Sequence, residues 1–339
     1  MNENTILKIE NLNVNFKLNQ KFFYILRDIN VNICKKEKIA VVGESGCGKS
    51  TLANTILLLN DKKITNYSGN LEFFPIKNCC KKNKYEIIKQ QEIISEDEIR
   101  HIRGNHISII FQDPFNALNP VIPIGKQIEE VILNHNKEYN KKEVYNKTIE
   151  LLEMVNLKEP ELIYKKYPHQ LSGGQIQRIC ITIAIANKPE IIIADEPTTA
   201  LDADLKDSIL ITLKDLVEKE SSALILITHD IGIIKNYVDY VFILYLGEII
   251  ESAKTQDVFK NPLHPYTEFL LSCYIDSTKK GQKLPAIPYD PVSLDDENFI
   301  FKKCIFLNRC SKKKKKCEIL KPEVFNIESH KVKCWLYEE

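Results

Sequence analysis

Glycines, a lysine and a serine stand at the spacing of a phosphate-binding loop in the segment Gly43-Glu-Ser-Gly-Cys-Gly-Lys-Ser50. The apolar run 39–42 precedes this segment as a buried strand would, and a helix is predicted over 52–59. Glycine lets backbone N–H groups converge on phosphate oxygens, and the N-terminal end of the following helix is positive. The sequence therefore predicts a nucleotide site formed by Gly43, Glu44, Ser45, Gly46, Cys47, Gly48, Lys49, Ser50 and Thr51.

Three side chains of this loop have distinct expected properties. Lys49 would place a mobile positive charge beside the β and γ phosphates, and Ser50 would place its hydroxyl on Mg²⁺. Cys47 lies near a helix N-terminus, where the pKa of a thiol can fall and its reactivity rise. Packing as a small residue is the interpretation that we favour for Cys47, with the reactive thiol as the alternative.

Two further segments carry polar residues that suit a nucleotide-binding enzyme. Asp195 and Glu196 end the apolar run 191–194, and P-loop enzymes hold Mg²⁺ and organise water at such strand ends. The peptide Leu171-Ser-Gly-Gly-Gln175 opens a predicted helix over 176–187, and the start of that helix offers a second positive end to an anion. One ATP needs only one phosphate-binding helix N-terminus, so the second predicted anion-binding site requires its own explanation.

The elements that must position these residues are predicted to form an α/β fold. Short continuous apolar runs at 107–111, 191–194 and 223–227 are rich in Ile and separated by helical patterns, as buried parallel strands are. Apolar and polar residues alternate over 7–16 and 29–33, which predicts an antiparallel β layer. We therefore expect an α/β core with an antiparallel β subdomain beside it.

The remaining segments are predicted from weaker patterns. Residues 115–187 show little strand signal and apolar residues at helical spacing, which predicts an inserted helical subdomain. The polar, lysine-rich segment 75–95 is interpreted as a variable excursion without an assigned structure. After about Asn261 the periodicity fades, prolines accumulate and a tail rich in lysine and cysteine follows. We expect these last residues to form a separate C-terminal extension.

Composition limits the class of protein. The 339 residues include 47 Lys and Arg against 46 Asp and Glu, and the net charge of +1 gives no overall basic surface for nucleic acid. No secretory signal is visible, and the most apolar stretches are interrupted too often to span a bilayer, so a cytosolic chain is expected. Ten cysteines in a reducing compartment favour thiol, metal or core roles over disulfides.

The ordered motifs resemble those of the ATP-binding cassette family, from Leu7 to about Ser272. The signature peptide of that family is Leu-Ser-Gly-Gly-Gln, present here as Leu171, Ser172, Gly173, Gly174 and Gln175. Gln112 resembles the family's Q-loop glutamine, Asp202 its D-loop aspartate and His229 its switch histidine. The resemblance implies a P-loop ATPase domain over residues 1–260, with the helical subdomain at roughly 115–187.

The resemblance also implies how ATP and Mg²⁺ are bound. Two subunits would form a head-to-tail dimer, in which the signature peptide of one subunit closes over the phosphate loop of the other. This arrangement explains why the chain has a second predicted anion-binding site at its signature peptide. Ser50, Gln112 and Asp195 would support the Mg²⁺ ion.

Catalytic and adenine-binding roles are implied in the same way. Glu196 would polarise the attacking water, and Gln112, the third catalytic residue, would approach both that water and the metal. His229 would contact the γ phosphate, a positioning and electrostatic role. Tyr24 is the favoured aromatic for stacking on adenine, while Phe22, Phe23 and plain core packing remain alternatives.

Three longer phrases, at 111–120, 167–172 and 261–266, resemble the branch that energises oligopeptide and dipeptide importers. They imply a peripheral ATPase at the cytoplasmic face of the cell membrane. Its partners would be a second ATPase subunit in a heterodimer, two transmembrane permease subunits and, indirectly, an extracytoplasmic substrate-binding protein. Nickel or another small solute is the alternative cargo. A soluble ATPase of translation or DNA maintenance is the competing class, and no nucleic-acid partner is expected.

The tail contains four cysteines, Cys304, Cys310, Cys317 and Cys334. Thiolates favour an iron–sulfur cluster or zinc, but this spacing is looser than a zinc knuckle and matches neither common ferredoxin pattern. Over residues 261–339 the chain resembles the cysteine-bearing C-terminal region of peptide-importer ATPases, which implies a [4Fe-4S] cluster. Zinc and unligated thiols remain alternatives, and a redox-sensing module that gates ATP turnover is a further one.

Overall fold

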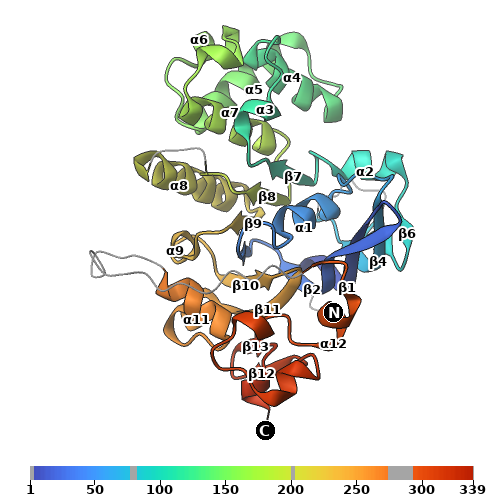
Figure 1. Ribbon diagram of the computed structural model, residues 1–339. Helices are drawn as coiled ribbons and strands as arrows, with labels where there is room; N and C mark the ends of the chain where they lie inside the picture. Colours follow the sequence, from blue (N-terminus) through green and yellow to red (C-terminus); the bar gives the residue numbers. More distant parts are fainter. Residues whose placement is uncertain (1–3, 77–81, 200–202, 274–292, 339) are drawn as a thin grey trace.

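The computed structural model describes residues 4–76, 82–199, 203–273 and 293–338. Two β-sheets organise this part of the chain, and helix α1 (Lys49–Ile56), which follows the phosphate loop, packs between them. A layer of helices covers one end of the molecule, and the C-terminal segment covers the opposite end (Figure 1). The fold is a mixed α/β arrangement with one antiparallel and one mixed sheet, as the sequence predicts for its core.

The first sheet has five strands and is antiparallel throughout, as the alternating apolar residues predict. Its two long strands come from the segments with that alternation. The last two strands come from segment 75–95, which the sequence left without an assigned structure. In spatial order the strands are β2 (Lys21–Cys34), β1 (Thr5–Leu18), β4 (Thr65–Phe73), β5 (Tyr85–Lys89) and β6 (Glu92–Ile93).

The second sheet has eight strands, and the five neighbouring strands at one side of it, which end with the edge strand β7, are parallel. The predicted apolar runs at 39–42, 107–111, 191–194 and 223–227 form four of these strands, whereas the fifth, at Tyr240–Tyr245, was not predicted. The phosphate loop and the acidic pair lie at the carboxyl ends of two of the predicted strands. In spatial order the strands are β12 (Phe325–Ile327), β13 (His330–Val332), β11 (Glu248–Lys254), β10 (Tyr240–Tyr245), β3 (Lys38–Val42), β9 (Ala223–Thr228), β8 (Ile191–Asp195) and β7 (Ile107–Ile110).

The central strands are buried on both faces, and successive residues belong to different cores. Ile191 and Ile193 of β8 pack with α1 and the antiparallel sheet, whereas Ile192 and Ala194 pack with the helices on the other face. Side chains of a strand alternate between its two faces, so a continuous apolar run serves two cores at once. This arrangement fixes the strand ends on which the polar site residues lie.

The chain between β7 and β8 is helical wherever it has regular structure. Buried Ile and Leu side chains of these helices join the core beneath the sheet. The helices there are α3 (Pro114–Ala117), α4 (Ile124–His135), α5 (Lys141–Met154), α6 (Pro160–Lys165), the 3₁₀ turn η1 (Pro168–Gln170) and α7 (Gly173–Ile185). Two other helices follow β8 and β9, α8 (Ala203–Glu220) and α9 (Ile231–Ile234), and α2 (Glu96–Ile102) lies near the antiparallel sheet.

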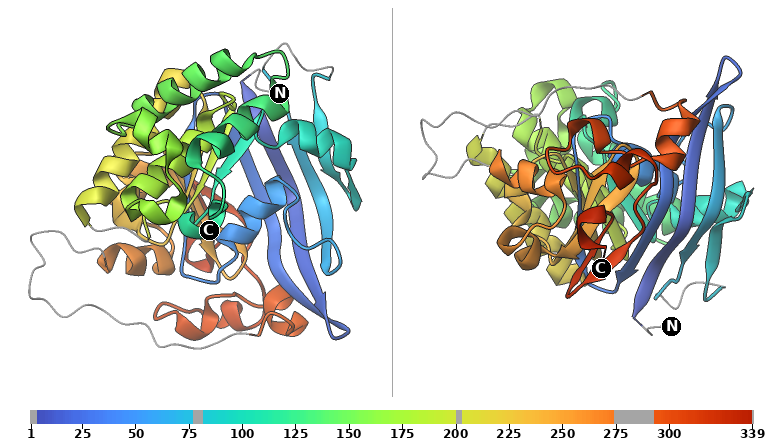
Figure 2. Two further views of the ribbon diagram at one scale, coloured as in Figure 1. Left: turned by 90° about the horizontal axis from the view of Figure 1, so that it is seen from above. Right: turned by 60° about the horizontal axis from the view of Figure 1, so that its bottom comes forward.

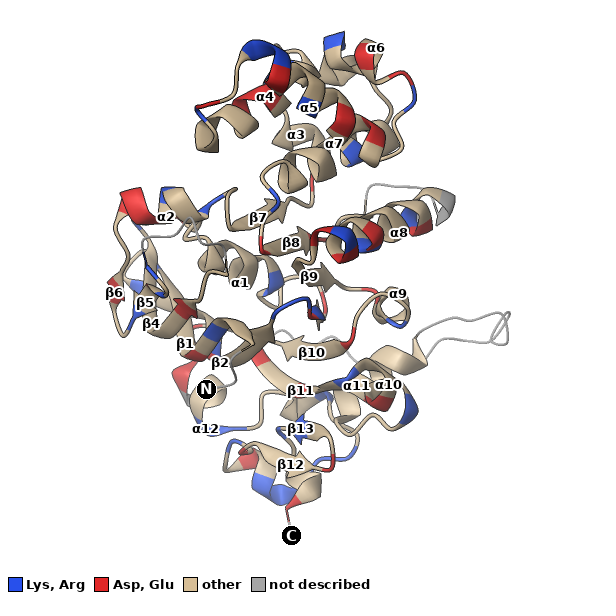
Figure 3. Ribbon diagram, turned by 180° about the vertical axis from the view of Figure 1, so that it is seen from behind, with Lys and Arg blue, Asp and Glu red and all other residues tan. Residues whose placement is uncertain are grey.

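Charged residues of both signs are interspersed over the helices, as Figure 3 shows for α5 and α8. This pattern agrees with the small net charge of the whole sequence. None of the helices in the described part of the chain combines the length and apolar character needed to cross a membrane.

The segment predicted as a C-terminal extension, for which that name is kept, packs against the rest of the described chain through a strand and several apolar side chains. Strand β13 pairs with β11, and Cys304, Phe306 and Trp335 belong to the main apolar core. Figure 2 shows this segment lying across the sheet, with α12 beside the end of the β1–β2 hairpin. Helix α10 (Thr255–Lys260) directly precedes this segment, whose own helices are α11 (Pro265–Ser272) and α12 (Glu297–Lys302), with 3₁₀ turns η3 (Leu307–Arg309), η4 (Lys315–Glu318) and η5 (Trp335–Tyr337).

Candidate functional site

The phosphate loop joins β3 to α1 and is packed tightly against the β10–β11 hairpin. A Cβ atom on Gly43 would lie 2.1 Å from the carbonyl oxygen of Leu244 and 2.7 Å from Sγ of Cys47. Gly48 has φ +107°, in the left-handed region that favours glycine. The N–H of Gly247 donates to the carbonyl oxygen of Cys47 at 2.8 Å. The loop can therefore keep this path only with glycine at these positions.

Lys49 and Ser50 begin helix α1. The buried Lys49 ammonium donates to the carbonyl oxygens of Gly43 and Glu44, at 2.8 Å and 2.9 Å, so it lies within the loop. The Ser50 side chain lies close enough to the carboxyl group of Asp195, at the end of β8, to lower the pKa of that group. The structure thus brings together the predicted phosphate and Mg²⁺ residues at the ends of β3 and β8, two strands that are separated by β9 in the sheet.

Asp195 provides the observation that fits a bound cation. Its Oδ1 atom is buried and has no hydrogen-bond partner within the described ranges. Burial raises the pKa of this carboxyl group, although the Ser50 side chain and the charge of Lys49 oppose the rise. Mg²⁺ is bound in proteins by such oxygen ligands, so Asp195 and Ser50 form a suitable donor pair.

Glu196 follows directly and gathers three side chains around its carboxylate. Gln112 Nε2 donates to Oε2 at 3.0 Å, the Thr199 hydroxyl donates to Oε2 at 2.8 Å, and His229 Nδ1 lies 3.1 Å from Oε1. The backbone of Glu196 has φ +45°, a conformation that costs energy for a residue other than glycine. Gln112, Glu196 and His229, which are far apart in the sequence, therefore meet at one point.

The surroundings of Glu196 keep its carboxylate ionised. Burial would raise the pKa of Glu196, but the hydrogen bonds of its carboxylate with His229 and Thr199 and the nearby Lys49 charge outweigh that effect, and the pKa of Glu196 is lowered. The His229 side chain is 49% exposed, whereas that of Glu196 is 8% exposed. A partly open imidazole thus faces a nearly buried carboxylate.

The alternative of a reactive Cys47 is wrong. Cys47 is buried, and burial raises the pKa of its thiol to about 11, although the nearby Lys49 charge lowers it in part. Desolvation of the thiolate outweighs the helix terminus because the side chain points into the core beside Gly43. Packing as a small residue, the favoured interpretation, describes this side chain.

Tyr24, the predicted adenine partner, contacts the C-terminal extension. Its hydroxyl donates to Glu297 at 2.7 Å, and its ring meets that of Phe301 edge to face at 4.9 Å between centroids. The N–H of Tyr24 donates to the carbonyl oxygen of Leu294 at 3.0 Å. Phe22 is exposed, with the Lys17 ammonium over its ring. The extension therefore borders the aromatic residue that the sequence assigns to adenine.

The signature peptide forms the start of α7. The Ser172 hydroxyl accepts from the N–H of Gln175, and the N–H of Ser172 donates to the Gln175 side chain, which makes a capping box. Ser172 is exposed, whereas Gly174 is buried and a Cβ there would meet Leu205 at 3.4 Å. Asp202, the predicted D-loop aspartate, lies outside the residues that the structure describes.

Two residues of the extension contact the phosphate loop, and sequence analysis did not assign either to the site. The N–H of Glu44 donates to the Tyr266 hydroxyl at 3.0 Å. Both carboxylate oxygens of Glu44 accept from the guanidinium group of Arg309, each at 2.9 Å. Tyr266 lies in the segment 261–266, which resembles the importer branch. Arg309 could not be singled out, because it is one of many basic residues in a lysine-rich segment.

The four cysteines of the tail lie close enough to influence one another. Burial raises the pKa of Cys304 to about 12, and the thiols of Cys317, Cys334 and Cys310 raise it further. Burial likewise raises the pKa of Cys334 to about 11, with Cys310 and Cys317 adding to the effect. Among the described residues, however, no three His, Cys, Asp or Glu side chains are arranged to hold a metal ion.

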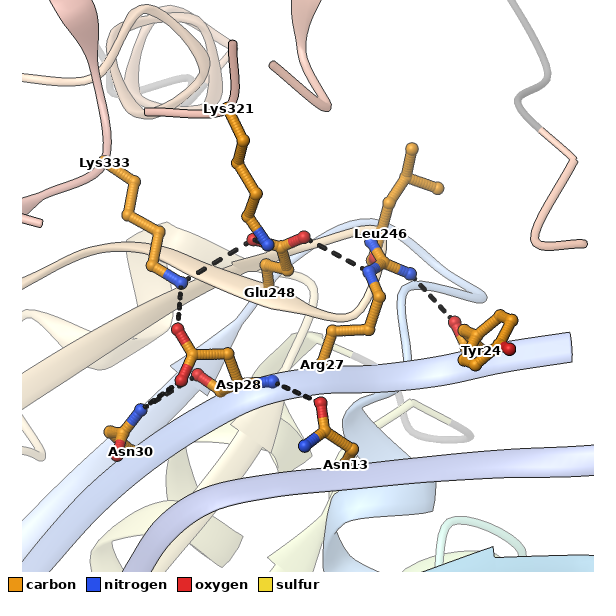
Figure 4. Close-up of polar contacts among 9 residues, drawn as sticks. All are labelled: Asn13, Tyr24, Arg27, Asp28, Asn30, Leu246, Glu248, Lys321 and Lys333. Carbon is orange, nitrogen blue, oxygen red and sulfur yellow. Dashed lines mark hydrogen bonds and ion pairs between the residues drawn. The ribbon is translucent and has the colours of Figure 1, made fainter. Parts of the chain in front are cut away.

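A buried ionic network joins the extension to the strands beside the phosphate loop (Figure 4). Glu248 accepts from Arg27 at 3.1 Å and pairs with Lys321 at 2.8 Å and Lys333 at 3.6 Å. Arg27 also donates to the carbonyl oxygen of Tyr24 at 2.8 Å, and Lys333 pairs with Asp28 at 3.0 Å. Lys321 and Lys333 of the extension therefore pair with the Glu248 carboxylate, which also pairs with Arg27. Arg27 in turn donates a hydrogen bond to the backbone of Tyr24.

Comparisons with known proteins agree with this geometry. Residues 26–199 match the family described as ABC transporter, and residues 250–317 match the oligopeptide/dipeptide transporter C-terminal region. The chain is 38% identical to the oligopeptide transport ATP-binding protein AppD of Bacillus subtilis over 99% of this chain and 98% of that protein. It is 36% identical to OppD of Lactococcus lactis subsp. cremoris over 91% of this chain and 87% of that protein.

A similar structure is the dimeric ATP-binding cassette MJ0796, solved in a post-hydrolysis state with ADP and Pi. It has a TM-score of 0.60 and 30% identity, and the match covers 74% of this chain and 99% of that one. The fold, the phosphate loop and the Glu196 cluster define a nucleotide-hydrolysing cassette. The chain belongs to the ABC transporter family, and as a member of that family it is an ATPase.

Proposed function

We propose that this chain is the ATPase subunit of an importer for oligopeptides or dipeptides. The match of residues 250–317 to the C-terminal region of oligopeptide/dipeptide transporters supports peptide over nickel or another small solute. AppD, OppD and DppD, at 35–38% identity, are named for oligopeptide or dipeptide transport. The matches favour this function over that of a soluble ATPase of translation or DNA maintenance.

We propose that the site residues bind ATP and Mg²⁺ and position the water that attacks the γ phosphate. Gly43 to Thr51 surround the phosphates, Tyr24 lies against adenine, and Ser50, Asp195 and Gln112 support Mg²⁺. The ion would neutralise charge on the phosphate oxygens. Glu196 orients and polarises the attacking water, and His229 stabilises the γ phosphate. The convergence of Gln112 and His229 on Glu196 is the observation that carries this assignment.

A second cassette completes the site. The exposed Ser172 and the helix terminus that it caps suit an anion held by another subunit. We assign Leu171, Ser172, Gly173, Gly174 and Gln175 to the ATP of that partner, and Asp202 remains the D-loop aspartate by resemblance. We propose a heterodimer at the cytoplasmic face of the membrane, with two permease subunits and an extracytoplasmic substrate-binding protein delivering cargo. Residues 1–260 would be the ATPase domain, with the helical subdomain at 115–187, and 261–339 the transporter-type extension.

The extension would hold a [4Fe-4S] cluster through Cys304, Cys310, Cys317 and Cys334. The four thiols influence one another, and thiolates are the ligands that such a cluster takes, which supports this proposal. Bound there, the cluster would supply an anionic group that ties the segments of the extension together. Iron and sulfide analysis with visible spectroscopy after anaerobic purification tests the cluster. A folded, colourless protein without iron would exclude it.

The hydrolytic assignment is tested by Glu196→Gln. This variant keeps the shape of the side chain and should bind ATP while turnover stops, because the water would lose its polarising carboxylate. Normal turnover would contradict the proposal.

Purification of the protein from detergent-solubilised membranes tests the proposed importer. Co-purification of permeases and a second cassette ATPase would support the proposal, whereas co-purification of ribosomes or DNA complexes would contradict it.

A further inference from the structure

Glu44 of the phosphate loop is held at two points by the C-terminal extension. Its N–H donates to the hydroxyl of the buried Tyr266, and its carboxylate accepts both terminal nitrogens of Arg309. The guanidinium plane matches a carboxylate in this two-bond geometry, which fixes orientation as well as distance. The Arg309 side chain is 11% exposed, so the pair is shielded from solvent on the arginine side.

Arg309 is joined to the cysteine segment by covalent and noncovalent contacts. It ends the short 3₁₀ turn η3 and directly precedes Cys310. Its Nη1 atom lies 3.3 Å from the Tyr245 hydroxyl, and the guanidinium lies over the Tyr245 ring. Phe306, two residues after Cys304, packs against the rings of Tyr245 and Tyr266. A movement of the cysteine segment would therefore be transmitted to the guanidinium group.

We propose that Arg309 is a positioning residue for ATP binding, acting through Glu44, so that nucleotide affinity depends on the fold of the four-cysteine segment. The physical reason is charge. Glu44 lies in a loop that must accept the negative phosphates, and an unpaired carboxylate there repels them. Arg309 neutralises that carboxylate and holds it aside. The inference rests on the nucleotide site proposed above.

A cycle of variants in the full-length chain tests this inference. The readout is the Kd of a fluorescent ATP analogue with Mg²⁺, measured alongside KM and kcat. Arg309→Gln should raise Kd and KM by about five- to tenfold, a usual size for coupling between sites, with kcat changed much less. Arg309→Lys should give an intermediate Kd because an ammonium restores the charge without the two-bond geometry.

The decisive comparison uses Glu44→Gln as the background. With the carboxylate removed there is no charge to neutralise, so adding Arg309→Gln should change Kd by less than about twofold. An equal rise in Kd with and without Glu44 would overturn the inference, as would an unchanged Kd in Arg309→Gln alone. Lys312→Gln is the matched control, since Lys312 pairs with Glu268 in the same segment at 2.7 Å and 2.6 Å, away from the loop.

Two further measurements separate the possible failures. Trp335 is the one tryptophan of the sequence and lies in the extension, so its emission reports whether the extension of each variant stays folded. If Arg309→Gln unfolds the extension, the Lys variant and the Glu44→Gln background decide the outcome. Lys49→Ala should abolish nucleotide binding, and unchanged binding there would overturn the proposed site itself rather than the role of Arg309.

Discussion

The imidazole Nδ1 of His229 lies 3.1 Å from Oε1 of Glu196, at the ends of two adjacent strands of the central sheet. The pair joins a partly exposed group, which can reach a nucleotide, to a nearly buried carboxylate. Gln112 and Thr199 occupy the other oxygen of Glu196, so the carboxylate is fixed in one orientation. A fixed carboxylate is already oriented for the water that it must hold, which is the main requirement in phosphoryl transfer.

His229→Ala should therefore reduce turnover without preventing nucleotide binding. Loss of one preorganised donor commonly lowers kcat by about 10²–10³-fold. Single-turnover hydrolysis and a separate binding titration would show this split between kcat and Kd. His169→Ala is the control, because His169 stacks on Tyr167 away from Glu196 and should leave both quantities near those of the unaltered chain. Loss of binding in the His229 variant would contradict the assignment.

Alkylation of Cys47 should be slow at neutral pH and accelerate as pH rises. The thiol pKa of about 11 is above the ordinary value, so the reactive thiolate gains population only as pH approaches 11. At pH 8 the thiolate fraction would be about 0.1%. Mass spectrometry of the peptide that contains Cys47, after iodoacetamide treatment over pH 7–10, measures the rate. A rate that levels off below pH 8 would contradict the burial argument.

Gly43→Ala should distort the phosphate loop. The added methyl group would meet a backbone carbonyl at 2.1 Å, which cannot rotate away as a side chain can. We expect a loss of stability of about 1–3 kcal/mol, typical of overpacking, and weakened ATP binding. Gly46→Ala is the matched control: φ is +81°, but no atom lies within 4 Å of its Cβ position. That variant should cost only about 1 kcal/mol from backbone strain.

Glu248→Gln should destabilise the junction between the ATPase core and the extension. The carboxylate is 1% exposed and faces Arg27, Lys321 and Lys333 (Figure 4). Removing the anion leaves buried cations unpaired, at a cost of about 3–5 kcal/mol. Glu318→Gln removes an exposed pair with Lys313 and should change stability by less than about 1 kcal/mol. Denaturant unfolding compares them, and equal midpoints would count against a structural role for the network.

Much of the core was predictable because local pattern and tertiary role coincide there. The strand at 191–195 reads as a continuous apolar run because both of its faces are buried, and the glycines of the phosphate loop mark positions where a Cβ cannot fit. Strands β5 and β6 were missed because they are short and lie in a lysine-rich segment that offers little alternation.

The contacts of the extension could not be predicted for a different reason. Arg309 and Glu44 are 265 residues apart, and neither residue type nor spacing indicates that they pair. Strand β13 has three residues, too few to show a period. The resemblance to a transporter family indicated that an extension exists and carries cysteines, but the contact with the phosphate loop became visible only from the folded chain.

Strand β13 covers a sheet edge that could otherwise pair with another molecule. It covers the outer side of β11 at Glu251 and Ser252, and the N–H of Lys333 donates to the carbonyl oxygen of Ile250 at 2.8 Å. A chain shortened before β12 would present β11 as a bare edge, with backbone groups ready to pair with another molecule. We therefore expect the extension to reduce aggregation, because it covers a sheet edge that its removal would expose.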